Sequence, residues 1–87
     1  MDKIYELTNT KDALKLLFIL NEKGELFSKQ IIDEGINDRT LVKARKILVR
    51  FGLVELTKVE GSKRLYYKLT FKGKILTKKL MTINEEL

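Results

Sequence analysis

The sequence predicts an α+β domain in which three helices are followed by a two-stranded hairpin and a last helix. Through residue 51, apolar side chains recur at the three- and four-residue spacing of amphipathic helices. Between residues 53 and 69 they alternate with polar ones, as in half-buried strands. Single glycines separate these segments and the chain has no proline, so residues 1–87 are predicted to form one domain.

The first predicted helix spans residues 9–23. Asn9 or Thr10 can cap its N-terminus, and Gly24 can end it in a left-handed conformation. The preceding residues 1–8 offer apolar side chains for packing but no clear period, so their structure stays ambiguous.

Two further helices are predicted before the hairpin. The second spans residues 28–34, with Ser28 as its N-cap. The third spans residues 38–51 and can be capped by Asn37 or Asp38.

The hairpin is predicted over residues 53–69, with its tip at residues 59–63, where Gly61 supplies a positive φ. Thr70 then caps a last helix over residues 70–84. This order of elements is that of a winged helix-turn-helix.

Composition excludes several classes of protein. The chain contains no Cys and no His, which removes disulfides, thiolate metal sites and the commonest general base. We therefore expect a protein that is not an enzyme and that binds no cofactor and no metal. The longest apolar run, residues 16–20, is too short for a membrane span, so we expect no membrane partner and a cytoplasmic, nucleoid-associated location.

The positive charge is concentrated in the second half of the chain. Residues 1–34 carry five Lys/Arg and seven Asp/Glu, a net charge of −2, whereas residues 35–87 carry thirteen and five, a net charge of +8. This asymmetry is typical of a face that binds a polyanion. A lysine-rich solubilising surface is the alternative explanation.

The third predicted helix separates apolar from cationic residues. At about 100° per residue, its apolar side chains gather on one side and four cations fall within roughly 60° on the other. A merely solvated face usually mixes charges of both signs, and here the only acid is Asp38 at the cap. The four cations are Arg39, Lys43, Lys46 and Arg50.

Such a helix fits the major groove of duplex DNA. Residues early in a reading helix reach base edges, so Arg39, Thr40 and Lys43 are the expected base contacts. Lys46 and Arg50, which follow later, are expected to neutralise phosphates.

The hairpin tip adds two cations, Lys63 and Arg64. A cationic ribbon can lie along the DNA backbone or in the minor groove, so we expect phosphate contacts here without base specificity. The alternative is an ordinary polar turn, which the acidic Glu60 favours.

Residues 38–55 resemble the recognition-helix segment of winged-helix regulators of the MarR and PadR type. The matching features are a hydroxyl–aliphatic pair, Thr40 and Leu41, early in the helix and a Gly-Leu-Val step at residues 52–54. Residues 67–73 are similar to the Leu-Thr-x-x-Gly signature that follows the second wing strand in these families. The resemblance implies DNA contacts by Arg39, Thr40, Lys43, Lys63 and Arg64.

The chain departs from these families by lacking their long flanking helices. Its small size and many lysines resemble the minimal winged-helix proteins of archaea and archaeal viruses.

The last predicted helix carries apolar residues at coiled-coil spacing. This row of apolar residues, which we call the seam, could pack against the domain's own first helix. The seam runs further along the helix than so small a domain can cover, so we expect it to form a homodimer. The first helix or residues 1–8 would contribute to it. The expected dimer interface is Leu76, Leu80 and Ile83.

Other functions stay open at this point. A chromatin-type protein would bind DNA without sequence preference, and a protein-interaction module would present an apolar or mixed-charge third helix. An RNA-binding winged helix would depend on exposed aromatics such as Tyr66, because the major groove of A-form RNA is too narrow for a helix. No feature of the sequence identifies a small-molecule effector.

Overall fold

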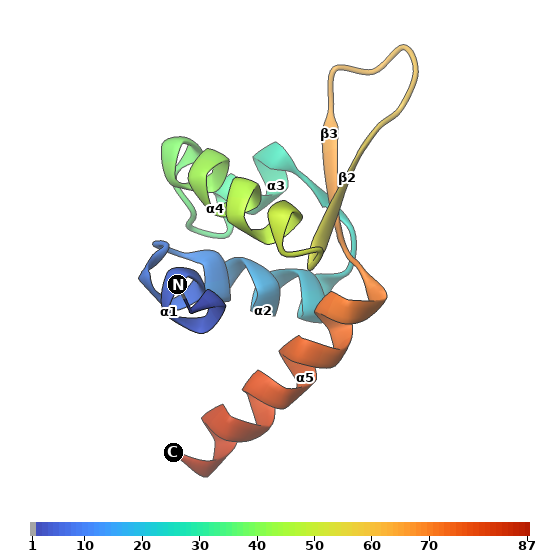
Figure 1. Cartoon of the computed structure of the whole chain (residues 1–87). Helices are drawn as coiled ribbons and strands as arrows, with labels where there is room; N and C mark the ends of the chain where they lie inside the picture. The colour runs from blue at the N-terminus through green and yellow to red at the C-terminus, as the bar shows by residue number, and fades with distance from the viewer. Residues whose placement is uncertain (1) are drawn as a thin grey trace.

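The computed structural model describes residues 2–87, and these form a group of helices with a small antiparallel sheet at one side (Figure 1). The two longer strands form a hairpin that stands away from the helices (Figure 1). In chain order the elements are α1 Lys3–Asn9, α2 Ala13–Lys23, β1 Leu26–Phe27, α3 Ser28–Asp33, α4 Asp38–Arg50, β2 Val54–Lys58, β3 Leu65–Leu69 and α5 Phe71–Glu86.

The expected helix over residues 9–23 begins later than predicted, at Ala13, and a separate helix, α1, precedes it. Neither Asn9 nor Thr10 caps α2. The Thr10 hydroxyl instead donates to the carbonyl of Glu6 at 2.8 Å, which satisfies a free carbonyl at the end of α1. The chain then reverses at Asp12, which has a positive φ of 62°. Met1 of the ambiguous opening segment lies outside the described residues.

The second predicted helix is α3, and Ser28 is its first residue rather than its cap. The amide of Phe27 donates to the side-chain oxygen of Gln30 at 3.0 Å, so the glutamine satisfies a free donor at this helix end. Immediately before α3, the two residues of β1 pair with Tyr66 and Tyr67 of β3. A strand this short leaves no pattern in the sequence.

The predicted hairpin forms the wing, which is residues 54–69. β2 and β3 pair antiparallel, with Val54 opposite Leu69 at the base and Lys58 opposite Leu65 near the tip. Gly61 has a φ of 81° in the turn, as the sequence predicts. The sheet order is β1-β3-β2, so β3 lies in the centre and β2 forms the outer edge.

The core surrounds α2. Leu16 and Leu17 of this helix are completely buried, against Leu41 and Leu48 of α4 and Tyr67 of β3. This packing fixes the outer face of α4 relative to the wing. Among residues 2–87, no helix is both long enough and apolar enough to cross a membrane.

A tight junction joins the wing to α5. Thr70 caps α5, as the sequence predicts, by accepting a hydrogen bond from the amide of Gly73 at 2.9 Å. The backbone amide of Thr70 donates to the carbonyl of Leu53 at 3.0 Å. Gly73 is buried directly against that same carbonyl, so the residue has no room for a side chain. The glycine in the Leu-Thr-x-x-Gly segment therefore allows the close approach of α5 to the start of β2.

Candidate nucleic-acid interface

α4 presents its cationic stripe to solvent. The stripe is defined as Arg39, Lys43, Lys46 and Arg50, and all four side chains are exposed. Asn37 caps the helix by accepting from the amide of Arg39 at 2.9 Å, which leaves Asp38 in the first turn. α4 contributes no acidic side chain to the middle of the stripe, so its outer face is positive over the helix length.

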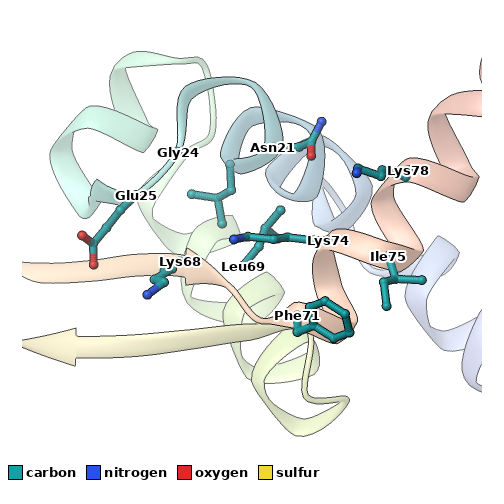
Figure 2. Close-up of a pocket in the computed structure, with 10 residues that line it drawn as sticks. Asn21, Gly24, Glu25, Lys68, Leu69, Phe71, Lys74, Ile75 and Lys78 are labelled. Carbon is teal, nitrogen blue, oxygen red and sulfur yellow. The ribbon is translucent and has the colours of Figure 1, made fainter.

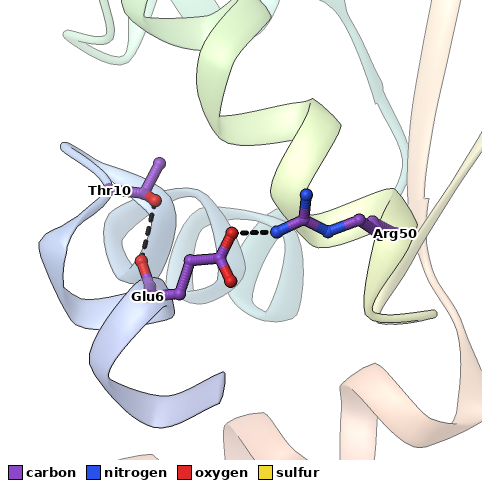
Figure 3. A network of polar contacts seen from close by, with 3 residues as sticks. All are labelled: Glu6, Thr10 and Arg50. Atoms are coloured by element: carbon purple, nitrogen blue, oxygen red, sulfur yellow. Dashed lines mark hydrogen bonds and ion pairs between the residues drawn. The ribbon is translucent and has the colours of Figure 1, made fainter. Parts of the chain in front are cut away.

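Arg50, at the C-terminal end of the stripe, is paired within the chain. Its guanidinium forms an ion pair with Glu6 of α1 (Figure 3). The same Glu6 accepts the Thr10 hydroxyl at its backbone carbonyl, which ties α1 to the turn before α2. A phosphate that binds Arg50 must therefore compete with a carboxylate, which the sequence did not indicate.

This competition yields a first prediction. Glu6→Gln removes the carboxylate and frees Arg50, so duplex DNA affinity should rise by up to about fivefold, the value of an exposed ion pair. The slope of log affinity against log salt should stay close to the wild-type value, because Arg50 neutralises one phosphate in both complexes once it has left Glu6. Fluorescence anisotropy at several salt concentrations measures both quantities.

Glu22→Gln is the matched control, since Glu22 is an exposed acid on α2 that lies outside the cationic face. If both variants raise affinity equally, the effect is one of net charge, and Arg50 has no DNA contact of its own.

A hollow borders the stripe on the side of the α1–α2 turn. It has a volume of about 590 Å³ and is lined by Thr40, Lys43 and Lys46 of α4 and by Lys11 of the turn. Lys11 is exposed and extends the positive surface beyond the helix. Its position depends on the chain reversal at Asp12.

A second cationic hollow lies on the other side of α4, between α3 and the wing. We call it the wing hollow, and its volume is about 540 Å³. Arg45 lines it, and the Arg45 guanidinium donates to the hydroxyl of buried Tyr67 at 2.8 Å. The cations that line the wing hollow are Lys29, Arg45, Lys58, Lys63 and Arg64.

Aromatic side chains attach the wing to the body. The Arg64 guanidinium lies over the Phe27 ring, 4.4 Å from its centroid. Phe27 in turn packs edge-on against Tyr66, with the ring centroids 5.6 Å apart. Tyr66 is therefore half-covered rather than free on an open sheet face, which weakens the RNA-binding alternative.

The structure thus brings the predicted site residues to both sides of α4, with Arg39, Thr40 and Lys43 near its start and Lys63 and Arg64 across the wing hollow. Sequence reasoning missed further cations that tertiary packing brings to these two hollows. Their only sequence signal was the excess of positive charge after residue 34. The missed residues are Lys11, Lys29, Arg45 and Lys58.

The expected dimer residues lie on one face of α5. Leu76 and Leu80 are half-buried and pack against the domain's own core, whereas Ile83 is 54% exposed. Leu69, seven residues before Leu76, lies in β3 and belongs to the core. The seam is thus intramolecular at its start and open toward the end of α5, which projects from the body (Figure 1).

Comparison with known proteins identifies the fold. A solved structure described as a transcriptional regulator homologue from Pyrococcus horikoshii OT3 superposes with a TM-score of 0.78. The match covers 99% of this chain and 93% of that chain, at 19% sequence identity. No protein-family model matches the chain, and no curated protein matches it by sequence. The domain is a winged helix, in agreement with the fold that the sequence predicts.

Proposed function

We propose that this protein is a sequence-specific double-stranded DNA-binding protein that regulates transcription. The observation that carries the proposal is the exposed stripe of four cations on α4, flanked on both sides by cationic hollows. Affinity for DNA comes largely from such phosphate neutralisation. The solved structure of similar fold, described as a transcriptional regulator homologue, supports the regulatory role.

In the proposed complex, α4 lies in the major groove and the wing contacts the backbone or the minor groove. Arg39, Thr40 and Lys43 read base edges, since they occupy the first turns of the helix. Lys46 and Arg50 bind phosphates, with Arg50 exchanging Glu6 for DNA. The two cationic hollows receive the phosphate backbones that border the major groove, with Lys63 and Arg64 contributing from the wing.

We further propose that the protein binds as a homodimer through α5, with Leu76, Leu80 and Ile83 at the interface. One reading helix covers only a few base pairs, which gives little discrimination among genomic sites. A two-fold dimer doubles the contact and requires half-sites about one helical turn apart, or a multiple of it.

Two substitutions on α4 test the division between base reading and phosphate binding. Arg39→Ala should cost about 1 to 3 kcal/mol on a duplex selected from a random pool and should flatten discrimination among sequences. Lys46→Ala should weaken all duplexes about equally and lower the salt slope by about one. Gel-shift titrations on selected and random duplexes measure both effects.

The same titrations examine the alternatives. If both variants lose the same factor on selected and random DNA, the protein is a chromatin-type binder without sequence preference. If single-stranded DNA or double-stranded RNA displaces the duplex at equal concentration, the placement of α4 in the major groove is wrong.

A further inference from the structure

α5 and α1 leave an apolar groove between them. Both helices pack on the body of the domain, and the groove has a volume of about 380 Å³. Leu7 and Ile4 line it from α1, and Leu76, Leu80 and Ile83 line it from α5. The side chain of Ile4 is 71% exposed, so the groove is open to solvent. Its charged neighbours are Lys3, Lys72 and Lys79, and no acidic residue within residues 2–87 lines it.

The groove face of α5 has the pattern of a coiled coil. Its apolar positions are Leu76, Leu80 and Ile83, and Leu87 continues the pattern at the C-cap, with spacings of four, three and four residues. In heptad terms Leu80 and Leu87 occupy position a, and Leu76 and Ile83 occupy position d. The flanking g positions are Lys72, Lys79 and Glu86, and the e positions are the uncharged Thr77 and Asn84.

We propose that α5 of a second copy of this chain fills the groove antiparallel to the first α5. This inference deepens the homodimer stated above by fixing its orientation and its charged contacts. The apolar end of each α5, Ile83 and Leu87, packs on Leu80 and Leu76 of the other copy. Ile83 and Leu87 are open to solvent in a single chain, and Leu87 is fully exposed. Both become buried in this dimer.

Charge selects the antiparallel orientation. In a parallel pair, g positions face e positions of the other helix. Here Thr77 is buried within its own domain and Asn84 is uncharged, so neither can pair with Lys79 or Glu86 of a second copy. When one helix is reversed, g positions face g positions, so Lys79 of each copy meets Glu86 of the other. The midpoint between Lys79 and Glu86 falls within about one residue of the midpoint of the apolar seam, so one two-fold axis serves both sets of contacts.

A charge-reversal experiment tests this register. Lys79→Glu places acids at both inner g positions, and Glu86→Lys places cations at both, so each variant should self-associate about tenfold or more weakly than the wild type. An equimolar mixture should form a heterodimer, because every g–g contact in it is then attractive. Sedimentation velocity at tens of micromolar, with one variant fluorescently labelled, measures these states.

Lys78→Glu is the matched control. It makes the same charge change at position f, on another side of α5, where Lys78 lines a separate hollow with Phe71 and Ile75 (Figure 2). It should leave the dimer unchanged. A second variant, Ile83→Asp, places a charge in the groove at an exposed position and should give a folded monomer.

The outcomes separate the register from the dimer itself. A monomeric wild type at tens of micromolar overturns both. If Ile83→Asp is monomeric while the single charge variants stay dimeric, or if the mixture fails to associate, α5 forms the interface but the antiparallel g–g contact is wrong. Circular dichroism of each variant shows whether the fold is retained. None of these results depends on DNA, so the proposed DNA binding stands or fails separately.

Discussion

We expect duplex DNA affinity to fall steeply with salt. Five cations, Arg39, Lys43, Lys46, Arg50 and Lys63, each neutralising one phosphate, imply a log–log slope of about −4 to −5 per subunit, and roughly double for a dimer. Between 50 and 200 mM salt, one subunit would lose affinity by about several hundredfold. Anisotropy titrations of a labelled duplex over this salt range measure the slope.

The wing hollow adds a sharper form of the same test. If phosphates enter the wing hollow beside Lys29 and Lys58, these two lysines add to the five cations counted above. Lys29→Ala and Lys58→Ala should then each reduce the wild-type slope by about one. Lys78→Ala, on α5, should leave the slope unchanged. A slope near zero, or no duplex binding at low salt, would exclude DNA as the ligand of α4. A normal slope that neither wing-hollow variant alters would restrict the DNA contact to α4 and the wing tip.

The largest stability effect is expected at Gly73. In an ordinary helix, Gly→Ala stabilises by about 1 kcal/mol through backbone entropy. Here the added methyl would overlap the carbonyl oxygen of Leu53 and lie 3.0 Å from its carbonyl carbon. Backbone atoms cannot rotate away, so α5 must shift and the Thr70–Leu53 hydrogen bond must lengthen.

We therefore expect Gly73→Ala to destabilise the protein by about 3 kcal/mol, at the upper end of overpacking costs. For a domain of this size the melting temperature should fall by roughly 12 to 24 °C. Thermal unfolding followed by circular dichroism measures the change. Lys74→Ala, at the exposed next position of α5, should change the melting temperature little. A melting temperature at or above that of the wild type would show that the junction is looser than the structure indicates.

The sequence alone determined the elements whose signal is local. The charge division and apolar face of α4, the alternation of Leu65, Tyr67 and Leu69, the turn at Gly61 and the cap at Thr70 each depend on residues within a few positions of one another. These signals were sufficient to predict the winged-helix fold, because the order of elements leaves few ways to bury the apolar faces around α2.

Elements without a local signal were missed. α1 has seven residues, about two helical turns, and β1 has two, so each is too short for its periodicity to stand out in the sequence. β1 exists because β3 offers it a pairing edge, and the break before α2 exists because Thr10 bonds back to α1. The pairing of β1 and the break before α2 therefore both depend on contacts between different segments, which a helical wheel of one segment does not show.

For the candidate site, the sequence indicated which helix carries the cationic stripe, and tertiary structure decided what surrounds it. Arg45 reaches the wing hollow through Tyr67, 22 residues later, and Arg50 meets Glu6, 44 residues earlier. Likewise, periodicity found the seam of α5, but only packing separated Leu76 and Leu80, which touch the core, from Ile83, which is open to solvent. Periodicity records which residues share a face, whereas the neighbours of that face come from chain segments brought close by folding.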